Sequence, residues 1–252
     1  MGIFITGASS GLGEAFARFY AAQGHTLGLV ARRADRLQSL VESLPGKHFV
    51  YVLDVCDRAQ LHAAARHFIG HGGDVEIVIA SAGISAGTLT EQSDDFNVFQ
   101  SIFQTNVMAT VSTFEPFISG MIERGKGTLV GIASVAAVRG LPGAGAYSAS
   151  KSAVATYCES LRVELKPKGI GVVTIAPGYI RTEMTAKNPY KMPFLMEAND
   201  FAVRAARTIA QQCSYRVIPW QMGVVAKLMR LLPDWLYDRL AVNAPRKPRK
   251  LQ

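Results

Sequence analysis

The chain has 252 residues, of which 49% are hydrophobic and 18% are charged, and its formal net charge is +8. This composition excludes a largely disordered protein and provides enough apolar residues for a sizeable core. Seven basic and two acidic residues lie between Gln221 and Gln252, so this tail carries +5 and the preceding 220 residues carry only +3.

Short β-rich runs alternate with helix-length segments along the chain. The runs are rich in Val, Ile and Leu, as expected for strands that are covered on both faces. They lie at Gly2–Ile5, Thr26–Ala31, His48–Leu53, Val75–Ala80, Gly127–Ala133, Gly171–Ile175 and Arg216–Ile218. The helical segments lie roughly at 12–23, 34–43, 58–70, 94–123, 147–166 and 198–212.

This alternation predicts an α/β protein with a three-layer, doubly wound (Rossmann) fold, in which a seven-stranded parallel sheet has helices on both faces. The sequence has no internal repeat and no low-complexity linker. We therefore predict a single domain over residues 1–252, with a core at 1–219 and a helical extension at 220–252.

The first strand leads directly into a glycine-rich turn, which reads Thr6-Gly7-Ala8-Ser9-Ser10-Gly11-Leu12-Gly13 and is followed by an apolar helix. Glycines permit the tight turn and a close approach of the backbone to a pyrophosphate, and a helix N-terminus offers free N–H groups to the anion. A glycine turn made only for packing is the alternative. The position between a strand and a helix favours a dinucleotide site.

The end of the second strand bears on the choice of dinucleotide. An acidic residue about 20 positions past the glycines binds the ribose hydroxyls in NAD proteins, whereas an arginine there accommodates the 2′-phosphate of NADP. This chain has Arg32 and Arg33 at that place, and Asp35 already lies in the next helical segment. NADP(H) is therefore favoured over NAD(H), although the two arginines could also form a solvated face.

Together with this turn, a later set of residues carries a resemblance to a known family. The set is Asp54-Val55, Asn106, Ser134, Tyr147-x3-Lys151 and Pro177-Gly178. In this order and spacing it resembles the short-chain dehydrogenase/reductase family of single-domain type, over about residues 1–219. The resemblance implies an enzyme that interconverts a carbonyl and an alcohol with a nicotinamide cofactor.

Four residues carry the implied chemistry. Tyr147 and Lys151 are four positions apart, so their side chains share one helix face, and a cation beside a phenol lowers the pKa of the phenol. The resemblance implies that Tyr147 is the general acid/base, that Lys151 lowers its pKa and holds the nicotinamide ribose, and that Ser134 binds the substrate oxygen. It also implies that Asn106 binds a water linking Lys151 to solvent.

The resemblance also implies the cofactor contacts. Besides Tyr147 and Lys151, these are Gly7, Ser9, Ser10, Gly11, Leu12, Gly13, Arg32, Arg33, Asp54, Val55, Ala82, Gly83, Pro177, Gly178, Ile180 and Thr182. The family usually has Asn-Asn-Ala-Gly after the fourth strand, whereas this chain has Ala80-Ser81-Ala82-Gly83. This departure puts in doubt the hydrogen bonds that the two amides would supply, and Ser81 could replace one of them.

The segment Glu183–Asp200 is where members of the family differ most, and here it is rich in methionine and aromatic residues. Such a loop suits an adaptable apolar pocket, so we expect a hydrophobic carbonyl or alcohol as substrate. Burial of the loop as core or as a dimer contact is the alternative.

The extension is amphipathic from Trp220 to Leu240, and Pro233 should divide it into two helices. We expect it to pack over the cleft or against a neighbouring subunit, and peripheral contact with an anionic membrane is the alternative. We expect a homodimer or homotetramer. The basic tail Arg246–Lys250 is too short to indicate nucleic-acid binding.

The sequence also limits location and metal chemistry. No stretch is long and apolar enough to span a membrane, and Cys56, Cys158 and Cys213 lack the spacing of a disulfide or metal framework. A cytoplasmic protein with reduced thiols is expected. His67 and His71 have no accompanying carboxylate or thiol pattern, so no metal site is expected.

Three functions remain at this stage. The favoured one is an NADP(H)-dependent oxidoreductase. A 3-oxoacyl reductase of the fatty-acid type would share the catalytic residues, but the C-terminal extension argues against it. A non-catalytic regulator that senses NADP(H) is disfavoured by the intact set of Ser134, Tyr147 and Lys151.

Overall fold

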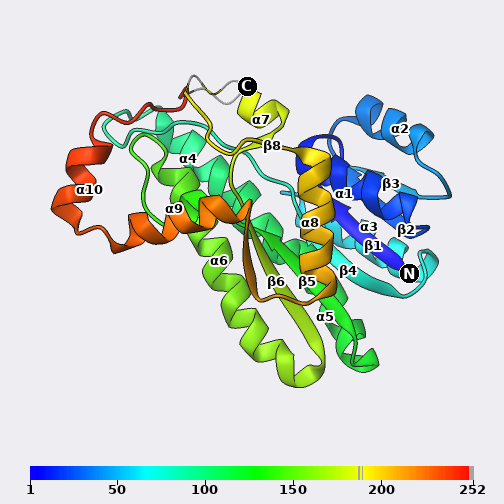
Figure 1. Cartoon of the computed structure of the whole chain (residues 1–252). Helices are drawn as coiled ribbons and strands as arrows, with labels where there is room; N and C mark the ends of the chain where they lie inside the picture. Colours follow the sequence, from blue (N-terminus) through cyan, green and yellow to red (C-terminus); the bar gives the residue numbers. More distant parts are fainter. Residues whose placement is uncertain (187, 189, 250–252) are drawn as a thin grey trace.

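Seven parallel strands form the central sheet of the computed structural model, which describes residues 1–186, 188 and 190–249. The strand order is β3-β2-β1-β4-β5-β6-β9, and every neighbouring pair is parallel (Figure 1). The strands are β1 (Gly2–Thr6), β2 (Thr26–Ala31), β3 (Phe49–Val52), β4 (Val75–Ala80), β5 (Gly127–Ile132), β6 (Ile170–Pro177) and β9 (Tyr215–Ile218). The predicted seven-stranded doubly wound fold is confirmed.

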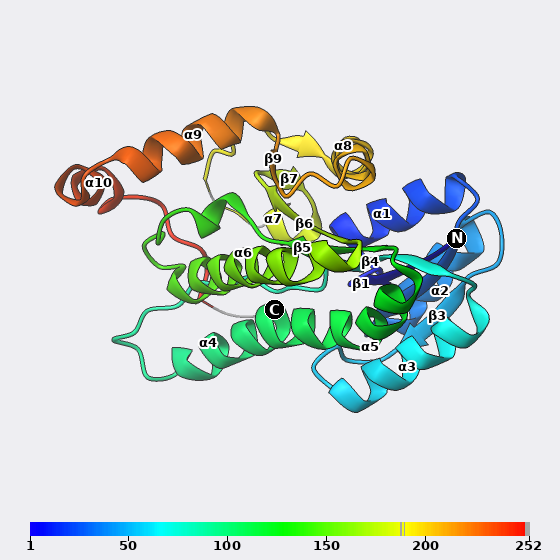
Figure 2. The same ribbon diagram turned by 90° about the horizontal axis from the view of Figure 1, so that it is seen from below.

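Helices cover both faces of the sheet (Figure 2). One face carries α1 (Gly11–Ala22), α2 (Ala34–Ser43) and α8 (Ala198–Ala210), and the other carries α3 (Arg58–His71), α5 (Ala109–Arg124) and α6 (Gly145–Leu165). Successive strand residues point to opposite faces. In β1, Ile3 and Ile5 therefore join the first core cluster, while Phe4 joins the second.

The predicted helix at 94–123 is interrupted in the structure. It consists of α4 (Asp95–Phe103), the π-helical segment η1 (Gln104–Met108) and α5. A π-helical turn carries one residue more than an α-turn, which changes the direction of its side chains, and such turns are frequent at functional sites. Asn106 lies in this turn and is buried.

The segment after β6 has more regular structure than the sequence indicated. It forms β7 (Ile180–Arg181), α7 (Glu183–Ala186) and β8 (Met196–Glu197), and β7 pairs with β8. Residues 187 and 189 of this segment, and residues 250–252 of the predicted tail, lie outside the described residues.

The extension forms two helices, α9 (Trp220–Leu231) and α10 (Asp234–Ala241), separated at Pro233 as predicted. It packs on the loop that follows β5. The guanidinium of Arg139 donates to the carbonyls of Met229 and Leu232 at 3.1 and 2.7 Å, and it lies 4.1 Å from the centre of the Tyr237 ring. The extension therefore covers the loop that follows β5, and its packing over the cleft or against a neighbouring subunit stays a prediction.

The extension exposes several large apolar side chains. Its exposed apolar side chains are Trp220, Val224, Leu228, Leu231, Trp235, Leu240 and Val242, and they lie among exposed charged residues such as Lys227 and Arg230. None of the helices within the described ranges combines the length and apolar character that a membrane crossing requires. Peripheral membrane contact stays an untested alternative.

Candidate active site

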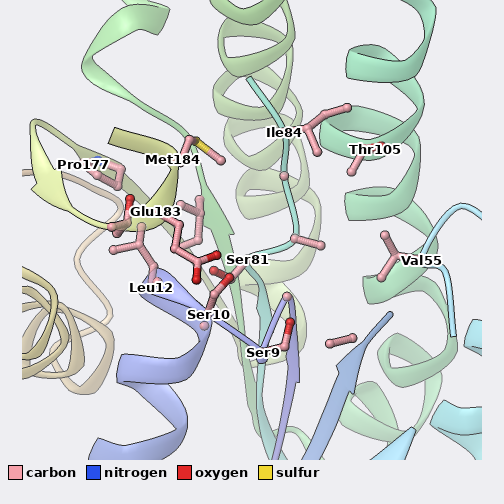
Figure 3. A pocket seen from close by; sticks show the side chains of 18 of the residues that line it. Ser9, Ser10, Leu12, Val55, Ser81, Ile84, Thr105, Pro177, Glu183 and Met184 are labelled. Atoms are coloured by element: carbon pink, nitrogen blue, oxygen red, sulfur yellow. The ribbon is translucent and has the colours of Figure 1, made fainter. Parts of the chain in front are cut away.

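The candidate site lies at the carboxyl ends of the strands, where the strand order reverses. β1 is flanked by β2 on one side and β4 on the other, and ligands of doubly wound sheets bind at such a switch point. A single pocket there is lined by the turns that follow β1, β2, β3, β4, β5 and β6 (Figure 3).

The glycine-rich turn forms the floor of this pocket. Gly7 and Gly11 have φ of 72° and 57°, in the left-handed region that side chains disfavour. A Cβ on Gly13 would lie 2.2 Å from the carbonyl oxygen of Gly7, so only glycine allows α1 to start this close to the turn. The free N–H groups of the first turn of α1, which begins at Gly11, make a site for an anion.

Arg33 lies across this turn. Its guanidinium donates to the hydroxyl of Ser10 at 2.6 Å and to the hydroxyl of Ser9 at 3.3 Å. Arg32 is more exposed and pairs with Asp54 at 3.5 Å. The two arginines are thus not equivalent, because only Arg33 reaches the glycine-rich turn.

An acidic residue that the sequence did not single out completes this end of the pocket. Glu183, the first residue of α7, pairs with Arg33 at 3.0 Å and also with Arg36. These two arginines hold the pKa of Glu183 below its usual range. Figure 3 shows Glu183 close to Ser10 and Leu12 of the turn.

The opposite end of the pocket holds Ser134, Tyr147 and Lys151. Ser134 follows β5 and is buried, and its hydroxyl accepts from the amide of Ala136 at 3.2 Å. Tyr147 and Lys151 come from α6. The Nζ atom of Lys151 donates to the carbonyl of Ile132 at 2.8 Å and lies 6.0 Å from the centre of the Tyr147 ring.

Burial dominates the proton affinities of this pair. Burial raises the pKa of Tyr147, and a hydrogen bond with Ser134 acts in the opposite direction. Burial lowers the pKa of Lys151 to about 8, because the ammonium has lost much of its hydration. The lowering of the Tyr147 pKa by Lys151, expected from the sequence, stays a prediction.

Asn106 supports this group from behind the pocket. Its amide nitrogen donates to the carbonyl of Ile84 at 3.1 Å and to the hydroxyl of Ser150 at 3.0 Å, and its amide oxygen accepts from the N–H of Ile84 at 2.8 Å. A Cβ on Gly83 would lie 3.2 Å from the Asn106 oxygen and 3.4 Å from Nζ of Lys151. Asn106 therefore fixes the strand end beside Lys151, and its predicted role in a water relay stays a prediction.

The loop with the unusual Ala80-Ser81-Ala82-Gly83 sequence is held by another residue. The amide of Ala82 donates to the hydroxyl of Thr6 at 3.3 Å. Thr6, at the end of β1, thus links the glycine-rich turn to this loop and supplies one contact where the family's amides are missing.

All the predicted cofactor contacts line the same pocket, and of the four predicted catalytic residues only Asn106 does not line it. Sequence reasoning missed several lining residues, among them Ile84 and Thr105, and it gave Glu183 and Thr185 no role beyond their place in the substrate segment. Met184, from the predicted substrate segment, also lines the pocket, whereas Phe194 is half exposed. The sequence also gave no sign that Lys247 reaches Tyr147, 5.1 Å from the ring centre.

Comparisons with known proteins agree with this geometry. The model of the family described as short chain dehydrogenase matches residues 2–192. An uncharacterized oxidoreductase of Myxococcus xanthus is 35% identical over 240 residues, which is 94% of each chain.

Two solved structures share the fold over nearly the whole chain. A short-chain dehydrogenase from Sphingobium yanoikuyae, in complex with NADPH, has a TM-score of 0.77 and 26% identity and covers 92% of this chain and 96% of its own. A short chain dehydrogenase/reductase from Burkholderia phymatum, in complex with NAD, has a TM-score of 0.82 and 25% identity. It covers 99% of this chain and 98% of its own. The chain therefore belongs to the short-chain dehydrogenase family.

Proposed function

We propose that this protein is an NADP(H)-dependent oxidoreductase that interconverts a carbonyl and an alcohol, with Tyr147 as the general acid/base. The observation that carries the proposal is the arrangement of one pocket, which has Ser134, Tyr147 and Lys151 at one end and the glycine-rich turn with Arg33 at the other. A bound nicotinamide dinucleotide would supply the hydride.

The residues of the pocket fit such a cofactor. The amides at the start of α1 would bind the pyrophosphate, Asp54 and Val55 would flank the adenine, and Lys151 would hold the nicotinamide ribose. Pro177, Gly178, Ile180 and Thr182 would contact the nicotinamide half of the cofactor. One related structure was solved with NADPH and another with NAD, so the preference for NADP(H) rests on Arg33.

The proton chemistry follows from the burial of Tyr147. In the reducing direction the phenol must be protonated, and its raised pKa keeps it so at neutral pH. Ser134 would orient the substrate oxygen toward the Tyr147 hydroxyl. After proton transfer to that oxygen, the ammonium of Lys151 would stabilise the phenolate, since a nearby opposite charge favours the ionised form.

We propose a hydrophobic part for the substrate, because Met184 lines the pocket. The test is a panel of aldehydes and ketones with NADPH, and of alcohols with NADP⁺, followed by the absorbance of NADPH. Turnover of an apolar carbonyl is the expected result. Activity confined to small polar carbonyls would contradict the apolar pocket, and no turnover with the whole panel would contradict the enzyme proposal.

We also propose that the protein is a homo-oligomer. Phe96, Phe99 and Met108 are exposed on the α4–η1 segment, where they leave an apolar surface that a second copy could cover.

Arg33→Ala is expected to raise the Kd for NADPH by about tenfold to a hundredfold and to leave the Kd for NADH nearly unchanged, because hydrogen bonds to charged groups contribute about 1.5–3 kcal/mol. Arg32→Ala is the matched control and should have the smaller effect, since Arg32 is exposed and pairs with Asp54. Fluorescence titration with both cofactors measures the difference. An equal loss of affinity for NADPH and NADH would show that Arg33 does not bind the 2′-phosphate.

Glu183→Gln is expected to tighten NADPH binding by about twofold to fivefold, since this carboxylate now holds the guanidinium that would bind the phosphate. The effect is small because exposed ion pairs contribute only about 0.2–1 kcal/mol. The Kd for NADH should not change. Glu197→Gln, which removes the exposed partner of Arg181, is the control. Weaker NADPH binding in Glu183→Gln would mean that the Arg33–Glu183 pair orders the site instead of competing for it.

A further inference from the structure

The C-terminal tail docks across the loop that follows β4. The carbonyl of Pro248 accepts from the amide of Gly87 at 2.7 Å. Arg249 donates to both carboxylate oxygens of Asp95, at 2.9 and 3.2 Å, and one of these oxygens also accepts from the amide of Leu89 at 2.8 Å. The side chain of Asp95 is only 8% exposed, so the tail is anchored to a buried carboxylate.

Small residues in two separate loops make room for the tail. A Cβ on Gly87 would lie 2.3 Å from the carbonyl oxygen of Lys247, and a Cβ on Gly143 would lie 3.0 Å from the side chain of Arg246. The two loops are joined by a bond from the amide of Thr88 to the carbonyl of Gly143, at 3.0 Å. The tail thus packs closely against both loops, next to the start of α6.

This docking places Lys247 over the catalytic tyrosine. Its Nζ atom lies 5.1 Å from the centre of the Tyr147 ring and donates to the hydroxyl of Ser85 at 2.7 Å. Among the described residues, Lys247 has no carboxylate within salt-bridge distance. Burial lowers the pKa of Lys247 to about 8, so at neutral pH it is still mainly a cation.

A half-buried cation without a counter-ion is costly unless it meets an anion during function. Lys151, the other buried cation here, already donates to the carbonyl of Ile132. Of the two acidic residues that line the pocket, Glu183 is engaged by Arg33 and Arg36, and Asp54 pairs with Arg32. An anionic group on the ligand that reaches Tyr147 would supply the partner that Lys247 lacks among the described residues.

We propose that Lys247 binds an anionic group of the substrate, so that the substrate is an aldehyde or ketone with a carboxylate, or a group of similar charge, within about three bonds of the reacting carbon. This inference rests on the proposed function, since it requires Tyr147 to act on the carbonyl oxygen. It adds a charged end to a substrate whose remainder meets apolar side chains such as Met184.

The test compares two oxo acids, phenylglyoxylate and levulinate, each with its neutral methyl ester. Lys247→Met keeps most of the aliphatic stem and removes the charge, and it is expected to lower kcat/KM for the acids by about tenfold, mainly through KM, with the esters changed by less than about twofold. Lys247→Arg should restore most of the preference for the acids. Lys227→Met removes an equal charge on the exposed side of α9 and is the control. It should leave the preference for acids over esters unchanged.

The other outcomes have distinct meanings. If Lys247→Met lowers kcat/KM equally for acids and esters, Lys247 has a structural role only. If it raises kcat/KM equally for both, the tail blocks the site. Either result overturns the inference. If Lys247→Met fails to fold, the test uses the wild-type enzyme in complex with NADP⁺. Mandelate should then have a lower Kd than its methyl ester, and equal Kd values overturn the inference. Absence of turnover with every carbonyl would instead overturn the proposed function.

Discussion

Tyr147→Phe is expected to lower kcat by about 10²–10⁴-fold, the usual contribution of a positioned general acid or base. The variant loses only the hydroxyl that we propose donates the proton, and its ring remains to pack beside Lys151 and Lys247. The Kd for NADPH should change by less than about threefold, because none of the predicted cofactor contacts but Tyr147 itself is altered. Stopped-flow turnover and fluorescence titration measure the two quantities.

Tyr157→Phe is the matched control, because Tyr157 lies on the same helix and packs against Phe114 away from the pocket. It should retain near wild-type kcat. If Tyr147→Phe kept more than about a tenth of the wild-type kcat, another group would have to donate the proton, and the assignment of the general acid would be wrong.

Gly13→Ala is expected to reduce the free energy of unfolding by about 1–3 kcal/mol, the usual cost of forcing an extra carbon into a packed site. The added Cβ would lie 2.2 Å from the carbonyl oxygen and 2.6 Å from the carbonyl carbon of Gly7, and neither is the end of a flexible side chain. Relief of this clash must move the glycine-rich turn away from α1. We therefore also expect the Kd for NADPH to rise by about tenfold or more, since the turn loses its fit to the pyrophosphate.

Gly70→Ala is the control for this substitution. Gly70 lies in α3, and a Cβ there would meet nothing within 4 Å. Alanine should stabilise that helix by about 0.5–1 kcal/mol, because glycine has the poorer helix propensity. Urea denaturation and NADPH titration of both variants make the comparison, and similar results for Gly13→Ala and Gly70→Ala would refute the steric argument.

Much of the fold and of the candidate site could be predicted because the informative patterns are local. Strands covered on both faces must be apolar throughout, so the interior strands were recognised at nearly their observed bounds. The ends of parallel strands lie at one edge of the sheet, so residues that follow the strands, such as Gly7, Asp54 and Ser134, had to meet there. Pro233 divides α9 from α10 because proline lacks the amide that a continuous helix requires.

Features that depend on contacts between distant residues could not be predicted. The pairing of Arg33 with Glu183 joins residues 150 positions apart, and the contact of Lys247 with Ser85 spans 162 positions. The π-helical turn at Asn106 has no mark in the hydrophobic pattern of its helix. In each case the geometry depends on how segments far apart in the sequence pack against one another.

The sequence by itself thus determined the sheet, the glycine-rich turn and the identity of the residues that would surround Tyr147, because these follow from periodicity and from the positions of strand ends. Only the tertiary structure decided which charges meet. It separates Arg33 from Arg32, gives Glu183 its partners and brings Lys247 from a basic tail to the ring of Tyr147. The physical reason is that a local sequence pattern indicates which side chains are buried. The partner of a charged side chain instead depends on which distant segments of the chain pack beside it.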